Sequence, residues 1–98
     1  MSEHNQAQPI DKYLDGEGRV TRWPLRKNKQ DQDIVLAYLA TKFEPGRVYT
    51  EIEVNEVLKQ YHTFNDWAVL RRELFERGML NRSKDGAEYW VTPKTKIY

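Results

Sequence analysis

The sequence predicts a small α+β domain in which three amphipathic helices precede a short antiparallel hairpin. Apolar residues recur with helical spacing in three segments between residues 31 and 77, and after Gly78 they recur about every second residue. An Asp-Gly turn then separates two runs of β-forming residues. With a very short strand before the second helix, the predicted order is helix, strand, helix, helix, strand, strand. That is the order of a winged helix-turn-helix domain, whose hairpin forms the wing.

Composition limits the classes of protein to which the chain can belong. Its 98 residues, 39% of them hydrophobic, suffice for one small domain with one core. The chain has no cysteine, which excludes a disulfide framework and a thiolate metal site. No apolar run approaches membrane-spanning length, and the first residues lack the apolar core of a signal peptide. We therefore expect a soluble, cytoplasmic protein.

Four segments are expected along the chain. Residues 1–9 are polar and without periodicity, so they are predicted to be a disordered tail. Residues 10–28 are interpreted as an N-terminal arm packed on the domain. Residues 29–92 are assigned to the winged-helix domain itself, and residues 93–98 to a basic tail.

The arm combines a few apolar anchors with a turn. Ile10 and Leu14 lie on one face of a predicted short helix, and the Asp-Gly-Glu-Gly run at 15–18 is a turn. Polar and apolar residues then alternate like a short strand that buries Val20 and Trp23. Pro24, the next residue, ends any regular ladder.

The first helix is expected over residues 31–42. Asp31 or Asp33 can cap it and would favour the positive end of the helix dipole. The Glu-Pro-Gly run at 44–46 ends it, and a very short strand at 47–49 follows. Its predicted buried stripe comprises Ile34, Val35, Tyr38, Leu39 and Phe43.

The second and third helices are the best specified part of the chain. Thr50 is a good N-cap, and Glu53 completes a capping box with it. Tyr49 and Val54 have the spacing of a hydrophobic staple. Gly78 is placed to take the left-handed conformation that closes the third helix. The buried faces are predicted to comprise Val54, Val57, Leu58 and Tyr61 on the second helix and Trp67, Leu70 and Leu74 on the third.

The C-terminal hairpin is predicted from its turn chemistry. Residues 79–83 and 87–91 are expected to be strands, and the Lys-Asp-Gly run at 84–86 joins them. Pro93 ends the second strand.

Several separated segments resemble an uncharacterised family of small bacterial domains that occur alone or at the C-terminal end of helix-turn-helix transcriptional regulators. The resemblance is carried by YTEIEVNEVLKQY, LRRELFERGMLNR and DGAEYW, and also by LDGEGRVTRWPLRKNKQ and KFEPGRVY upstream. It covers residues 13–91. It implies a winged-helix-like fold and an association with transcription, and it carries no catalytic residues.

Charge is unevenly distributed along a chain whose formal net charge is only +1. Between residues 19 and 29 there are five basic residues and no acidic one. Such a run favours phosphate contacts, although a solvated surface segment would show the same charge pattern. Our main hypothesis is therefore a non-enzymatic, DNA-binding or transcription-associated protein whose partner is double-stranded DNA. Its candidate contacts are Arg19, Arg22, Arg26, Lys27 and Lys29 on the arm, Asn65 and Arg72 on the third helix, and Arg82 and Lys84 on the wing.

Two arginines of the third helix have competing interpretations. Arg72 is expected to be exposed, where it either contacts a base or pairs with Glu76 at i+4. Arg71 lies next to the core side, so we expect an ion pair with a carboxylate, for which the acidic second helix is a source. The alternative for Arg71 is a clamp for an anionic ligand beside Trp67.

Catalysis and metal binding are poorly supported. His62 and Asp66 can touch, but two ligands do not make a metal site, and a turn hydrogen bond explains the spacing. No phosphate-binding glycine motif, nucleophile with a nearby base or metalloprotease motif is present. We expect no enzyme activity, no cofactor and no metal. The alternative function is a protein-interaction or dimerisation module, with itself or another regulator as partner, that uses Trp23, Phe64 and Trp90.

Overall fold

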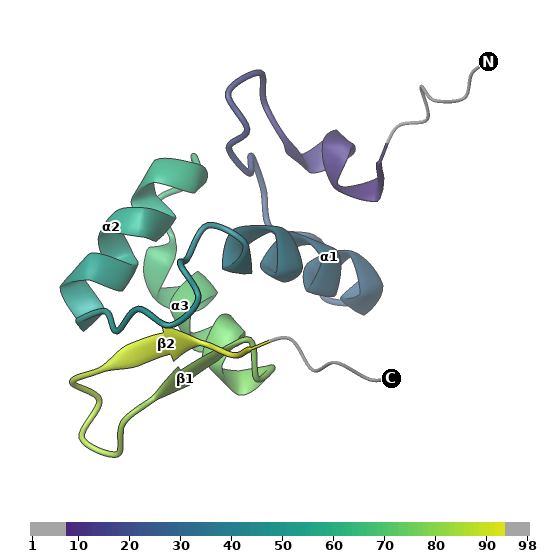
Figure 1. Cartoon of the computed structure of the whole chain (residues 1–98). Helices are drawn as coiled ribbons and strands as arrows, with labels where there is room; N and C mark the ends of the chain where they lie inside the picture. Colours follow the sequence, from purple (N-terminus) through teal and green to yellow (C-terminus); the bar gives the residue numbers. More distant parts are fainter. Residues whose placement is uncertain (1–7, 94–98) are drawn as a thin grey trace.

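A computed structural model describes residues 8–93 of the chain. It contains a short 3-10 helix, η2 (Pro9–Tyr13), then α1 (Lys29–Ala40), α2 (Glu51–Tyr61) and α3 (Trp67–Glu76), followed by strands β1 (Leu80–Arg82) and β2 (Tyr89–Val91). The two strands form one antiparallel sheet, in which Asn81 is opposite Trp90. The predicted α+β class with three helices and a small antiparallel sheet is confirmed (Figure 1). Most of the predicted disordered tail and basic tail, residues 1–7 and 94–98, lies outside the described residues.

One hydrophobic core joins the three helices, the sheet and the arm. Val54, Leu58, Leu70 and Leu74 are fully buried where α2 packs on α3, as their spacing predicts. Burying each such side chain stabilises the fold by roughly 1.5–3 kcal/mol. The other members of the cluster are Tyr13, Val20, Val35, Leu36, Leu39, Phe43, Tyr49, Leu80 and Tyr89.

The ends of the α2–α3 pair follow the local sequence signals. The Thr50 hydroxyl accepts a hydrogen bond from the Glu53 backbone N–H at 3.1 Å, and the Glu53 carboxylate accepts one from the Thr50 N–H at 2.9 Å. Beyond α3, Gly78 has φ +79°, and the Met79 N–H donates to the Leu74 carbonyl at 2.8 Å. The predicted capping box and glycine closure are therefore confirmed.

The predicted start of α1 is wrong. The helix begins at Lys29, neither Asp31 nor Asp33 caps it, and its N-cap residue Asn28 makes no side-chain capping bond. Asp31 instead accepts hydrogen bonds from the Tyr13 hydroxyl and the Asn28 amide, and it forms an ion pair with Lys12 at 3.2 Å. The Tyr13 hydroxyl, followed by Lys12, lowers the pKa of Asp31 below its ordinary value. A tertiary contact with the arm has thus replaced the expected local cap.

Two predicted short strands are reduced to isolated bridges, two of them at Val20 and one at Tyr49. The segment 19–23 forms no regular strand, but the Val20 N–H donates to the Tyr61 carbonyl at 2.8 Å and the Val20 carbonyl accepts from the Thr63 N–H at 2.9 Å. In the segment 47–49 only Tyr49 pairs, with Tyr89 of β2. The bonds of Val20 attach the arm to the corner between α2 and α3, and the bridge at Tyr49 brings the loop before α2 to the edge of the sheet.

A candidate nucleic-acid interface

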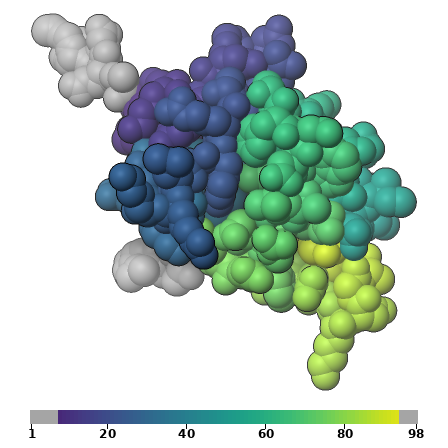
Figure 2. Space-filling view, turned by 180° about the vertical axis from the view of Figure 1, so that it is seen from behind, coloured from purple at the N-terminus to yellow at the C-terminus, as the bar shows by residue number. Residues whose placement is uncertain are grey.

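Two neighbouring hollows flank the outer side of α3. The first, of about 550 Å³, lies between α3 and the segment that leads into α1. The second, of about 210 Å³, lies between α3 and the hairpin. Arg72 lines both hollows and therefore lies between them. Figure 2 shows the three segments side by side on one face: blue residues before α1, green α3 and the yellow-green hairpin.

Exposed cations run along this face from the arm to the hairpin. Arg26 and Lys29 line the first hollow, Arg82 lines the second, and Arg72 lies between them. All four side chains are exposed, and within residues 8–93 none of them has a carboxylate within 4.0 Å. We call Arg26, Lys29, Arg72 and Arg82 the basic strip. Its charges are available to an external anion.

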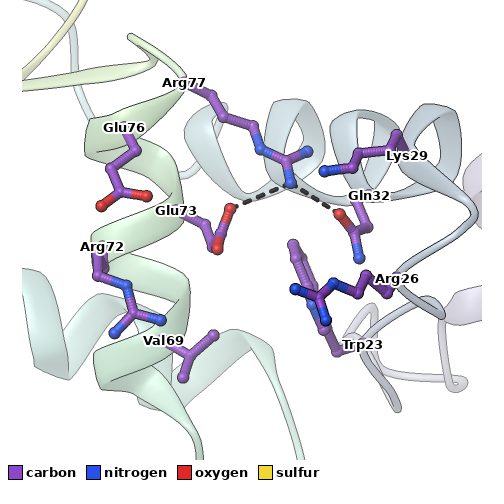
Figure 3. A pocket seen from close by; sticks show the side chains of 9 residues that line it. All are labelled: Trp23, Arg26, Lys29, Gln32, Val69, Arg72, Glu73, Glu76 and Arg77. Carbon is purple, nitrogen blue, oxygen red and sulfur yellow. Dashed lines mark hydrogen bonds and ion pairs between the residues drawn. The ribbon is translucent and has the colours of Figure 1, made fainter.

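The interpretation of Arg72 as an i+4 partner of Glu76 is not supported. Among the ion pairs of the described chain, none joins these two side chains, although both line the first hollow. Figure 3 shows the Arg72 guanidinium directed toward Val69 and the Glu76 carboxylate lying apart from it. A pair between two exposed side chains gains little in water, so the helical spacing alone does not enforce it.

Arg77 forms a polar network at the edge of the first hollow. Its guanidinium pairs with Asp33 of α1 at 2.7 Å and with Glu73 of α3 at 3.1 Å. It also donates to the side-chain oxygen of Gln32 at 2.7 Å (Figure 3). Gln32 is buried, and its amide nitrogen donates to the carbonyls of Pro24 and Leu25 at 3.0 and 3.3 Å. The network therefore fastens the loop before α1 to both α1 and α3.

The hairpin side of the strip is organised by aromatic and polar contacts. The Arg82 guanidinium lies 4.1 Å from the centre of the Phe75 ring, a cation–π distance that orients the guanidinium beside α3. Arg71 pairs with Glu51 at 3.5 Å and also donates to Asn55, both on α2. The predicted ion pair between Arg71 and an acidic residue of the second helix is confirmed.

The remaining candidate contacts lie elsewhere or are not placed in either hollow. Arg19 pairs with Asp15 and Glu17 at 2.8 and 3.2 Å, and the Arg19 backbone N–H is the main cause of the lowered pKa of Asp15. Arg22 stacks over Tyr13 at 4.7 Å. Asn65, with φ +57°, lines a third hollow. Lys27 is exposed beside Arg26, and Lys84 is exposed in the hairpin turn.

Sequence reasoning missed the two residues at the centre of the network, Gln32 and Arg77. Each left a signal. Gln32 stands three and four residues before Val35 and Leu36, so it shares their buried helix face and needs polar partners there. Arg77 follows Glu73 at the favourable i+4 spacing. Its additional partners on α1, 44 and 45 positions earlier in the chain, had no local signal.

His62 has a structural role at the corner between α2 and α3. It is buried, its Nδ1 lies 2.6 Å from the Leu58 carbonyl and its Nε2 accepts from the Asp66 backbone N–H at 2.8 Å. The expected turn hydrogen bond therefore reaches the Asp66 backbone. In the part of the chain that the structure describes, no group of three His, Asp or Glu side chains is arranged to hold a metal ion. No helix in that part has the length and apolar character needed to cross a bilayer.

Fold and surface together define a small α+β domain with a basic strip across its third helix. Residues 19–91 match DUF2087, a family described as an uncharacterized protein conserved in bacteria, and the chain belongs to this family. No curated protein and no solved structure matches the chain.

Proposed function

We propose that the protein is a winged-helix domain that binds double-stranded DNA in the bacterial cytoplasm, in association with transcription and without catalysis. The observation that carries the proposal is the basic strip, since arm, third helix and hairpin contribute cations to one face. Two features support the winged-helix interpretation: the order of the elements, and the bridge between Tyr49 and Tyr89, which takes the place of the short strand predicted before the second helix. The fusion of related domains to helix-turn-helix regulators, implied by the sequence resemblance, supports the link to transcription.

The geometry suggests how a duplex would be held. In helix-turn-helix proteins the second helix of the pair enters the major groove, and flanking segments contact the backbone. Here α3 is flanked by Arg26 and Lys29 on one side and Arg82 on the other, so phosphates on both sides of a groove have cationic partners. Glu73 of α3 pairs with Arg77 at 3.1 Å, which offsets part of its repulsion of a phosphate.

Fluorescence anisotropy of the full chain with a labelled mixed-sequence duplex, repeated over a range of salt, tests the proposal. If the basic strip neutralises four phosphates, log K falls with log salt at a slope of about −3.6. Arg72→Ala and Arg82→Ala should each weaken binding and reduce that slope by about 0.9. Arg47→Ala is the control, because Arg47 is also exposed but lines neither hollow. Absence of binding at low salt, or a slope near zero, contradicts the proposal.

A second candidate, the protein-interaction module, is favoured by a different observation. Val48, in the loop before α2, and Ile52, in its first turn, are large apolar side chains that remain 53% and 71% exposed. The aromatic residues predicted for this role are less exposed: Trp23 and Trp90 are half-buried, and Phe64 packs edge-on against His62 at 4.8 Å. Light scattering separates the candidates: a stable dimer that Ile52→Lys converts to monomer supports the interaction module.

Arg71, the residue of the ligand-clamp hypothesis, lines the second hollow but also has partners within the protein. Its guanidinium is used by Asn55 and Glu51 of α2, and its side chain is 20% exposed.

A further inference from the structure

We propose that the first hollow is a phosphate site, in which Arg26 of the arm, Lys29 at the start of α1 and Arg72 of α3 hold one phosphate group. The proposal rests on the proposed function for the source of that phosphate, the sugar–phosphate backbone of a duplex. A free phosphate ion shares the same chemistry, so the experiment below distinguishes the two sources.

Arg26 and Arg72 lie on opposite walls of the hollow. Figure 3 shows Arg26 in front of Trp23 on the arm side and Arg72 on the α3 side, with space between their guanidinium groups. A guanidinium presents two parallel N–H donors that fit phosphate oxygens, and Lys29 adds a mobile ammonium. A volume of about 550 Å³ accommodates a phosphate together with its sugar, which a site for an isolated ion does not require.

Two carboxylates line the same hollow and decide where in it an anion can lie. Glu73 pairs with Arg77 at 3.1 Å, but Arg77 also pairs with Asp33 at 2.7 Å, so the charge of Glu73 is only partly offset. Within residues 8–93, Glu76 has no cationic partner within 4.0 Å. The anion should therefore lie toward Arg26 and away from Glu76. Removing the Glu76 charge should strengthen binding, which a purely structural role for this surface does not predict.

Arg77 and Gln32 act as positioning residues for the site. Buried Gln32 binds the carbonyls of Pro24 and Leu25, directly before Arg26, and accepts a hydrogen bond from Arg77. The loop that carries Arg26 is thereby fixed relative to α3. Such fixing lowers the entropy lost when the cations close on a ligand.

The fluorescence of Trp23, which lines the hollow, reports occupancy. In the Trp67→Phe, Trp90→Phe background, duplex at low salt should change Trp23 emission, and inorganic phosphate at the same total phosphate concentration should not. Arg26→Ala should abolish the emission change and lower the salt slope by about 0.9, Arg47→Ala should do neither, and Glu76→Gln should tighten binding. If the double-Phe background does not fold by circular dichroism, fluorotryptophan NMR of the otherwise unchanged chain gives the same readout.

Each outcome decides a different claim. Duplex binding without a Trp23 response, or identical slopes for Arg26→Ala and Arg47→Ala, overturns the phosphate site and leaves the proposed function standing. Saturation by inorganic phosphate as readily as by duplex overturns the backbone as the source. If no duplex binds at all, the proposed function fails. In that case a saturable, Arg26-dependent change of Trp23 emission with inorganic phosphate supports the phosphate site. If inorganic phosphate causes no such change, the phosphate site is overturned as well.

Discussion

Replacing Arg77 by methionine should lower the free energy of unfolding by about 2–3 kcal/mol. The largest part arises because the Gln32 side-chain oxygen, in a residue only 4% exposed, loses its partner, which costs about 1–3 kcal/mol. The ion pairs with Glu73 and Asp33 add less, since Asp33 is 59% exposed. Methionine keeps the apolar stem, so the change removes charge and hydrogen bonds with little loss of packing.

Urea unfolding followed by circular dichroism measures this cost, and thermal unfolding should show a midpoint lower by about 10 °C or more. The same substitution at Arg47, which is 51% exposed and whose ion pairs are 3.8 and 3.9 Å long, should cost less than about 1 kcal/mol. A double-mutant cycle with Gln32→Leu should give a coupling energy above about 0.5 kcal/mol. If Arg77→Met unfolds within about 0.5 kcal/mol of the unmodified chain, the network does not fasten the arm and the reasoning is refuted.

Three further predictions concern the frame that carries the interface. Gly78→Ala should destabilise the fold by about 1 kcal/mol in urea titrations, because φ at this position is +79°. An added methyl group there meets no atom within 4 Å, so the cost arises from the backbone conformation alone. Gly16→Ala, which lacks that backbone strain, should be neutral or slightly stabilising. Thr50→Ala should cost about 1 kcal/mol by the same measurement, since it removes the side-chain half of the capping box, and an unchanged midpoint would contradict that role. The hydrogen bond from Tyr13 lowers the pKa of Asp31, so the stability this carboxylate contributes is present above its ordinary pKa of 3.8 and is lost as pH falls through the lower folded value. The stability difference between the unmodified chain and Asp31→Asn should therefore shrink between pH 5 and pH 3, and a difference independent of pH would argue against the bond.

The parts of the fold that the sequence predicted correctly depend on neighbours in the chain. Thr50 and Glu53 are three positions apart, and the closure at Gly78 involves the residues beside it, so both could be recognised without knowing the tertiary structure. Asp31 was assigned the wrong role because Tyr13, 18 positions away, competes for its carboxylate. Local propensity predicts a cap, and a long-range contact overrides it.

The candidate site was only partly accessible to the same reasoning. The exposure of Arg72 followed from helical geometry. Arg26 lines the same hollow as Arg72, and Arg19 does not, because of the way the arm folds back on the domain. The spacing of apolar residues does not predict that path of the chain. Arg77 is partly buried, and it was missed because two of its three partners lie on another helix, far away in the sequence.

The two backbone hydrogen bonds between Val20 and the corner of the α2–α3 pair have a practical consequence. An excised fragment that began at α1 would retain the full sequence of both helices, yet it would lose the amide and carbonyl that bond to Tyr61 and Thr63. Those two partners would then need water, and the angle between α2 and α3 would lose a restraint. Fragments for biophysical work should therefore start upstream of Tyr13, which lies in the same core as Val20.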